Sequence, residues 1–317
     1  MFPFSIIGDI LRYMLYAYVT TRFMKFAWVL AKSLYVHNFK KAFDVSHLLD
    51  TWAVVTGGTD GIGRAYCLEL ARARGMKKFY LIGRNEKKLA AIKDKLEQQY
   101  GAEVKTATFD FEKDDMEKLP KDLETLDIGI LLNCAGIAPQ QVGNMIELPP
   151  GLPSKILRVN LMSNIKMLEL VLPGMVKKDR GVIVNVASMT GWRPLPYLST
   201  YPASKAAISF YSDALADEFS DTNVKIQCLV PMLVATKVAS YEAGEANDIF
   251  VISTENFARQ AVHLMGLCSL GTGCWQHDMQ IAFGALVSPW LFKKLFVPLV
   301  MLGVHKQRVA EYASKHA

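Results

Sequence analysis

The sequence predicts an α/β fold with one doubly wound parallel sheet and apolar segments at both ends of the chain. Short apolar runs alternate with helical patterns through the middle of the chain, and a glycine-rich turn follows the first run. Such alternation places helices on both faces of a parallel sheet. In addition, 51% of the 317 residues are hydrophobic, which is high for a soluble domain. We expect an apolar segment over 1–48, one α/β domain over 49–278 and an apolar segment with a basic tail over 279–317.

The first strand is predicted over Trp52–Thr56, and a helical pattern begins at Arg64. A glycine turn between a strand and a helix lets backbone N–H groups hold a pyrophosphate. The spacing of the glycines differs from the G-x-G-x-x-G motif of dinucleotide-binding proteins. The prediction of a nucleotide site therefore depends on the position of the turn between a strand and a helix. A Rossmann-type dinucleotide site is therefore expected, with contacts from Gly57, Thr59, Asp60, Gly61, Ile62 and Gly63.

The second strand, Lys78–Ile82, ends in Gly83-Arg84-Asn85. An acidic residue at this place would bind the ribose 2′-hydroxyl of NAD, whereas an arginine accommodates the additional phosphate of NADP. Arg84 therefore favours NADP(H) as the cofactor, against the alternative of a surface arginine at a strand end.

Further apolar runs complete the predicted sheet, and helix-like segments separate them. These runs are Val104–Thr108, Ile128–Leu132, Val182–Val186 and Ile226–Val230. The charged stretch Lys87–Gln99 predicts an exposed covering helix. The small and acidic stretch Ala239–Asp248 predicts a substrate loop.

Three residues, Ser188, Tyr201 and Lys205, indicate which reaction the protein catalyses. Reduction of a ketone by a hydride leaves negative charge on oxygen, which requires a proton donor and a second hydrogen-bond donor. Tyr201 and Ser188 fit these two roles. A lysine four residues after a tyrosine shares its helix face and favours the phenolate, since a free phenol has a pKa near ~10. Alone, this pair is typical of a solvated helix edge, but the upstream glycine turn favours a nicotinamide-dependent oxidoreductase.

These motifs occur in the order typical of a known family, and from about Thr51 to Trp275 the chain resembles a short-chain dehydrogenase/reductase. The resemblance implies that Ser188, Tyr201 and Lys205 are catalytic, that Lys205 also binds ribose with Tyr201 beside the cofactor, and that Asn160 anchors a proton-relay water. It places Asp110 at the adenine. Leu132-Asn133-Cys134-Ala135-Gly136 matches the family's Asn-Asn-Ala-Gly signature with a cysteine for the second asparagine, which places Asn133 and Ala135 at the cofactor.

A narrower resemblance lies in Pro231-Met232-Leu-Val234-Ala-Thr236-Lys237, where most of the superfamily has Pro-Gly. This segment is similar to the branch with 17β-hydroxysteroid dehydrogenases and microsomal very-long-chain 3-oxoacyl-CoA reductases, as are Val171–Val176 and the stretch from Phe257 through His277 to Trp290. The resemblance places Pro231, Val234 and Thr236 at the cofactor, with Thr236 on the nicotinamide carboxamide. No single motif separates steroid from acyl-CoA activity.

Both ends of the chain carry apolar segments with interruptions. Charged residues interrupt Phe2–Val36, which predicts an interfacial or tilted helix on a membrane surface, or a helix packed on the domain. Near the other end, Met279–Phe292 and Leu295–Val304 are each too short to span a bilayer. Gly284, Pro289, Pro298 and Gly303 break regular helix, so this part is expected to form a monotopic hairpin or a lid over the substrate.

Composition narrows the possible partners and the compartment. The net charge of +6 is modest, and no basic–aromatic interleaving or zinc-ligand spacing is present, so we expect no nucleic-acid partner and no metal. Five cysteines without framework spacing favour reduced thiols and a cytosol-facing domain. The resemblance adds an endoplasmic reticulum membrane location and a homodimer formed through long helices.

The sequence therefore predicts an NADPH-dependent ketoreductase of large apolar substrates. A 3-oxoacyl-CoA stands ahead of a steroid, and fatty-acid elongation and 17β-hydroxysteroid interconversion are the two reactions considered. The alternative is a catalytically silent binding or scaffold protein that keeps the fold and the nucleotide. All four catalytic groups are present, which favours the enzyme.

Overall fold

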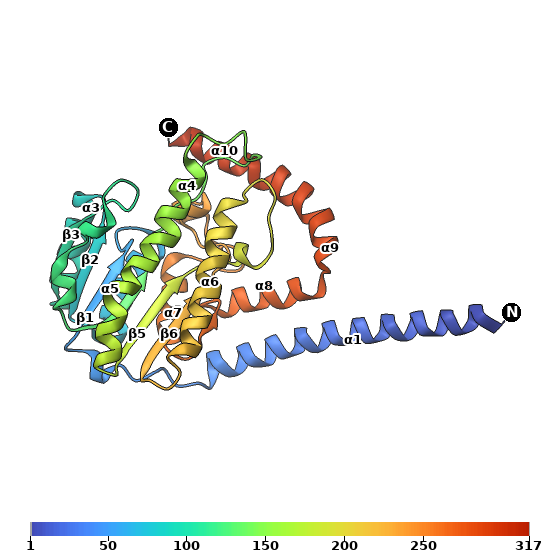
Figure 1. Ribbon diagram of the computed structural model, residues 1–317, viewed down its shortest axis with the longest axis horizontal. Coiled ribbons are helices and arrows are strands. Elements are labelled where there is room, and N and C mark those ends of the chain that lie inside the picture. Colours follow the sequence, from blue (N-terminus) through green and yellow to red (C-terminus); the bar gives the residue numbers. More distant parts are fainter. Residues whose placement is uncertain (1, 317) are drawn as a thin grey trace.

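Seven parallel strands form one sheet in the computed structural model, which describes residues 2–316 (Figure 1). The strand order is β3-β2-β1-β4-β5-β6-β7. The strands are β1 Trp52–Thr56, β2 Lys78–Gly83, β3 Glu103–Thr108, β4 Ile128–Asn133, β5 Gly181–Val186, β6 Val224–Leu229 and β7 Leu270–Gly271. The predicted doubly wound parallel sheet is confirmed, and its direction of winding reverses between β1 and β4, where open sheets of this type bind ligands.

Helices cover both faces of the sheet, and its central strands β1, β4 and β5 are therefore buried on both sides. One face carries α2 Gly61–Arg74, α3 Glu86–Tyr100 and α7 Thr254–His263, whose apolar side chains join one core cluster. The other face carries α5 Ser163–Lys177 and α6 Thr200–Glu218, which contribute to a second cluster. Both clusters are rich in Val, Ile and Leu from the strands, as expected for a parallel sheet.

Short helices connect these elements. They are η1 Ser46–Leu48, η2 Met116–Lys118, η3 Lys121–Glu124, α4 Leu152–Leu157, the π-helix η4 Arg158–Met162, η5 Met189–Trp192, η6 Lys237–Ala239 and η7 Ala243–Glu245. The predicted substrate loop therefore contains η7 and parts of η6.

The N-terminal helix α1, Phe2–Asn38, projects away from the domain (Figure 1). Its 37 residues correspond to a length of about 55 Å. The second half lies against α8, where Arg22 donates to the carbonyl of Ala285 at 3.1 Å and Phe26 packs on Phe283 with ring centroids 5.4 Å apart. Within residues 2–316, no helix combines the length and the apolar character needed to cross a membrane.

The last helices of the chain are α8 Trp275–Leu286, α9 Pro289–Leu291, the π-helix η8 Phe292–His305 and α10 Lys306–Lys315. We call residues 289–315 the strap. The domain limit predicted at residue 278 falls inside α8, so no end of a helix separates residues 278 and 279. Pro289 begins a new helix, as its fixed φ permits.

Of the four predicted breaks, the one at Pro289 agrees with the start of α9. The other three are wrong, since Gly284 lies inside α8 and Pro298 and Gly303 lie inside η8. A proline removes one backbone donor, which weakens an isolated helix. Here η8 is supported by tertiary packing, because Met301 and Val309 are buried with Val142 and Leu198 in a small apolar cluster. The sequence pattern reports local preference alone, and this packing outweighs it.

Candidate active site

The glycine turn after β1 has the close approach that a phosphate-binding loop requires. Gly57 has a φ of +69°, and a β-carbon added there would lie 2.8 Å from the backbone nitrogen of Ala135. A β-carbon on Gly63 would clash with the carbonyl oxygen of Gly57. The turn therefore admits only glycine at these positions, and the N-terminus of α2 follows directly. This geometry fits a dinucleotide pyrophosphate.

A cavity of about 780 Å³ lies along the carboxyl ends of the strands, next to this turn. It brings together most of the residues predicted from the sequence. These are Gly57, Thr59, Asp60, Gly61, Ile62, Arg84, Asp110, Ala135, Ser188, Tyr201, Lys205, Pro231, Val234 and Thr236. Segments far apart in the sequence thus form one site.

Three predicted residues lie beside the cavity instead of on its surface. Gly63 permits close packing of α2 on the turn. Asn133 is buried in the sheet, where its amide nitrogen donates to Asn185 at 3.0 Å. Asn160 is buried in η4. These three residues do not line the cavity, so their direct contact with a cofactor or substrate stays a prediction. Cys134 lines the cavity at the place expected for Asn133.

Basic side chains gather at the end of the cavity near the glycine turn. Lys88 donates to Asp60 at 2.7 Å, and Lys237 forms an ion pair with the same carboxylate at 3.4 Å. Burial opposes ionisation of Asp60, but the hydrogen bonds from Lys88 and from the backbone N–H of Gly61, together with the charges of Lys88 and Lys237, outweigh it and lower the pKa. Arg84 is 62% exposed and lies 3.8 Å from Glu112. This region can therefore accept an anionic group on the ribose.

Lys88 was missed by the sequence analysis, although it lies only four residues after Arg84. A second basic residue shortly after the end of β2 was the available signal. Lys237 was quoted only as part of a motif, because nothing in the sequence indicates that it reaches Asp60.

Ser188 and Tyr201 meet at the carboxyl end of β5. Ser188 follows this strand and caps η5, where its hydroxyl accepts from the backbone N–H of Thr190 at 3.2 Å. Tyr201 lies in the first turn of α6. Burial raises the pKa of Tyr201 to about 12, although a hydrogen bond with Ser188 acts in the opposite direction. Tyr201 is therefore protonated at neutral pH, in the form that donates a proton to a developing alkoxide.

Lys205 lies one turn after Tyr201 and is 5% exposed. Its ammonium group donates to the carbonyl of Val186 at 2.8 Å and lies 5.8 Å from the centroid of the Tyr201 ring. Burial lowers the pKa of Lys205 to about 8. The expectation that Lys205 lowers the pKa of Tyr201 is not met in this structure, because the burial of Tyr201 dominates.

Asn160 supports the loop beneath Lys205. Its side chain accepts from the N–H of Ile137 at 2.8 Å and donates to the carbonyl of Ile137 and to Ser204 at 3.0 and 3.1 Å. A β-carbon added at Gly136 would lie 3.5 Å from the Asn160 oxygen and 3.6 Å from the Lys205 nitrogen. Asn160 thus connects η4, the loop after β4 and α6 close to the ammonium group.

The strap forms one wall of the cavity, although its residues follow all seven strands in the sequence. Phe292 and Phe296 stack with ring centroids 4.4 Å apart, and both line the cavity. Arg193 places its guanidinium 4.9 Å from the centroid of Phe292, and Arg308 lies 3.9 Å from that of Tyr241. Arg308 also pairs with Glu245 at 2.9 Å. No pattern in the sequence indicates that these residues contact one another.

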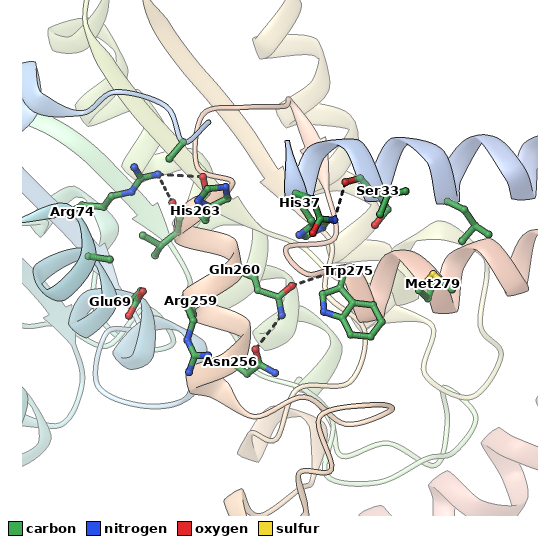
Figure 2. A pocket seen from close by; sticks show the side chains of 16 residues that line it. Ser33, His37, Glu69, Arg74, Asn256, Arg259, Gln260, His263, Trp275 and Met279 are labelled. Atoms are coloured by element: carbon green, nitrogen blue, oxygen red, sulfur yellow. Dashed lines mark hydrogen bonds between the residues drawn. The ribbon is translucent and has the colours of Figure 1, made fainter. Parts of the chain in front are cut away.

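A second, open groove of about 830 Å³ lies between α1, α2, α7 and α8 (Figure 2). Arg74 spans it and donates to the carbonyls of Val262 and His263 at 2.8 and 3.2 Å. Gln260 accepts from the N–H of Trp275 at 3.0 Å. Ser188, Tyr201 and Lys205 do not line this groove, so the chemistry belongs to the first cavity.

Replacement of Lys205 by methionine is expected to stabilise the folded protein near neutral pH. The pKa is depressed from 10.5 to about 8, so the folded state carries an unfavourable buried charge below pH 8. Removing the charge is worth roughly 3 kcal/mol at pH 7, and loss of the bond to Val186 offsets about 1 kcal/mol of this. We expect the free energy of unfolding to rise by about 2 kcal/mol, as measured by urea denaturation.

The gain should shrink as pH rises from 8 to 10.5. In this window the unfolded wild-type chain binds more protons than the folded one, so wild-type stability increases with pH. Lys87→Met changes an exposed lysine of α3 and serves as the control, with no change at either pH. A gain that is absent at pH 7, or constant up to pH 10.5, would contradict the buried charge.

Comparison with known proteins agrees with this site. A family model described as short chain dehydrogenase matches residues 51–246. A mouse very-long-chain 3-oxoacyl-CoA reductase is 36% identical over 252 residues, which are 78% of this chain and 79% of the relative. The Caenorhabditis elegans protein named uncharacterized oxidoreductase dhs-27 is 54% identical over 219 residues, or 67% of this chain, and this match spans 26% of the length of the worm protein.

Among solved structures, a short-chain dehydrogenase from Sphingobium yanoikuyae in complex with NADPH is similar, with a TM-score of 0.59 and 25% identity. The alignment covers 68% of this chain and 84% of that one. The family match, the parallel sheet and the joint placement of Ser188, Tyr201 and Lys205 agree. The chain belongs to the short-chain dehydrogenase family of oxidoreductases.

Proposed function

We propose that this protein is an NADPH-dependent ketoreductase of large apolar substrates, with long-chain 3-oxoacyl-CoA thioesters ahead of ketosteroids. One observation carries the proposal: protonated Tyr201 and Ser188 share a cavity with the apolar wall of the strap. The mouse relative named very-long-chain 3-oxoacyl-CoA reductase supports the substrate class. The proposed pathway role is the ketone-reduction step of fatty-acid elongation.

The residues of the site divide the work of the reduction. When bound, the cofactor supplies a hydride to the carbonyl carbon. Tyr201 gives its proton to the carbonyl oxygen, and the Ser188 hydroxyl donates a hydrogen bond to the same oxygen as charge develops. Lys205 stabilises the Tyr201 phenolate that remains and binds the ribose. Asn160 supports the path by which the phenol regains a proton from water.

The basic residues near the glycine turn support NADPH over NADH. Arg84 and Lys88 both line the cavity, and Arg84 has the planar donors that suit a phosphate. Gly57 leaves the close approach that a pyrophosphate needs.

The ends of the strap support an acyl-CoA over a steroid. Arg193 lies over Phe292 at the start of η8, and Arg308, in α10, lies over Tyr241 and pairs with Glu245; both line the cavity. An anionic CoA thioester gains from such a rim, whereas a neutral steroid does not. The apolar residues between them, including Phe296 and Val300, suit an acyl chain.

We also propose that α1 attaches the protein to the endoplasmic reticulum membrane, with the catalytic domain facing the cytosol. Apolar side chains are exposed around this helix, including Leu11 at 60%, Met14 at 64% and Trp28 at 69%. Water is an unfavourable surrounding for so much apolar surface, and a bilayer interface accommodates it. Pairing of two copies through the long helices stays a prediction.

Tyr201→Phe is expected to lower kcat by at least about a thousand-fold, because phenylalanine has no proton to donate. NADPH oxidation by the detergent-solubilised protein with a long-chain 3-oxoacyl-CoA, and separately with a 17-ketosteroid, measures this effect. The Kd for NADPH should change by less than about three-fold, since the ring is retained. Tyr211→Phe changes another tyrosine of α6 and should behave as wild type.

Turnover by Tyr201→Phe close to wild type would remove Tyr201 from the mechanism. Turnover of the steroid alone would replace the acyl-CoA by the second substrate. If the wild type binds NADPH and turns over neither ketone, these two substrate classes are ruled out, and either another lipid ketone or the scaffold alternative replaces them.

Arg84→Ala is expected to raise the Kd for NADPH about ten-fold or more and to leave the Kd for NADH nearly unchanged. A charged hydrogen bond to the 2′-phosphate is worth about 1.5–3 kcal/mol, and NADH lacks this phosphate. Titration of protein fluorescence measures both constants. Lys87→Ala, an exposed lysine outside the cavity, is the control. An equal loss for both cofactors would show that Arg84 does not recognise the phosphate.

Glutamates on α1 are expected to release the 317-residue protein from membranes. Leu11→Glu combined with Leu15→Glu places two charges on exposed positions of the helix. Flotation with phosphatidylcholine vesicles should recover wild type with the lipid and the double variant without it. Ile146→Glu alters a loop residue that is 93% exposed and should still float. Equal flotation of all three proteins would contradict attachment through α1.

A further inference from the structure

The segment 231–236, which follows β6, forms the wall between the cofactor turn and the strap. Pro231, Met232, Leu233, Val234 and Thr236 all line the cavity. At its far end the segment reaches the glycine turn, because a β-carbon added at Gly61 would lie 3.1 Å from the methyl group of Thr236. The position of this segment therefore sets the distance between the two sides of the site.

His277 contacts two consecutive residues of segment 231–236 from the first turn of α8. The backbone N–H of Met232 donates to His277 Nδ1 at 3.3 Å. Because Nδ1 accepts this bond, the neutral ring carries its proton on Nε2, which lies 3.3 Å from the carbonyl oxygen of Leu233 and donates to it. One imidazole thus satisfies a backbone donor and a backbone acceptor of the segment.

The surroundings of His277 hold the ring in one orientation and one charge state. Its side chain is fully buried, and the Phe257 ring packs against it with centroids 5.8 Å apart. Phe257 in turn lies against Gly273, which has a φ of +92° and no room for a β-carbon. Burial lowers the pKa of His277 to about 4, so the ring is neutral at physiological pH, as both hydrogen bonds require.

We propose that His277 is a positioning residue that fixes segment 231–236 for binding of the cofactor and the substrate. It touches neither the reacting atoms nor the cavity surface, and acts through the backbone of Met232 and Leu233. Its effect on turnover rests on the proposed reductase function, whereas its effect on the segment does not. A histidine that served only the core would lack this pair of hydrogen bonds to one loop.

His37 offers a matched control, because it contacts the residue of α8 next to His277. Asp278 is the residue after His277. Its carboxylate accepts a hydrogen bond from the Thr272 hydroxyl at 2.7 Å and lies 3.1 Å from Nε2 of His37 in α1. Figure 2 shows His37 in the groove between α1 and α8, near Trp275 and Met279. A change of His37 to phenylalanine removes a half-buried imidazole contact of α8 without touching segment 231–236.

Hydrogen–deuterium exchange of the full-length protein in detergent tests the proposal without a substrate. His277→Phe keeps the ring and removes both hydrogen bonds, so exchange of the amides in 231–236 should rise about ten-fold or more. The amides of β1, β4 and β5 should exchange as in wild type. His37→Phe should leave 231–236 unchanged. Unchanged exchange in His277→Phe, or an increase spread equally over the whole sheet, would overturn the proposal.

Kinetics then separate positioning from a general loss of stability. With NADPH and a long-chain 3-oxoacyl-CoA, His277→Phe should lower kcat/KM about ten-fold or more. His277→Asn keeps an acceptor for the Met232 N–H and should recover a large part of both the activity and the exchange protection. Equal losses in the two variants would contradict the positioning role. If the wild type itself does not turn over this substrate, the reductase proposal fails while the exchange measurement still decides the role of His277.

Discussion

The hydrogen bond from the Lys205 ammonium to the carbonyl of Val186 ties α6 to the carboxyl end of β5, and the geometry of the site depends on it. It places Tyr201 one turn away from a buried charge, next to Ser188 at the end of the same strand. Burial makes this charge unfavourable and lowers the pKa of Lys205 to about 8. The fold thus gives up stability at a place where a cation can support a phenolate during reaction.

The parallel sheet explains why distant motifs meet. The glycine turn follows β1, the Cys134–Gly136 loop follows β4, Ser188 follows β5 and Pro231 follows β6. Because parallel strands end at the same edge, these segments necessarily surround one cavity. His277 and the strap come from outside the sheet and close the cavity from the other side.

Local motifs were sufficient to predict six of the seven strands and the joint position of Ser188, Tyr201 and Lys205, because each depends on a strand end or a helix turn. The short strand β7, Leu270–Gly271, was not predicted, because two residues carry no recognisable strand pattern. The sequence could not show that the Asn133 side chain faces Asn185. Successive side chains of a strand point to opposite faces of the sheet, so an error of one residue in register reverses the predicted direction. The continuation of η8 through Pro298 depends on packing with Val142 and Leu198, which lie more than 90 residues away. The role of His277 depends on a loop 45 residues earlier.

Transfer of deuterium from NADPH that carries deuterium in both hydrogen positions at C4 of the dihydronicotinamide tests the proposed reaction most directly. Wild-type protein is incubated with labelled NADPH and a long-chain 3-oxoacyl-CoA, and the product is analysed by mass spectrometry. We expect a 3-hydroxyacyl-CoA with one deuterium on C3, and no labelled product from Tyr201→Phe. Bound NADPH that yields no deuterated product with this substrate would contradict the assignment of the site to 3-oxoacyl-CoA reduction.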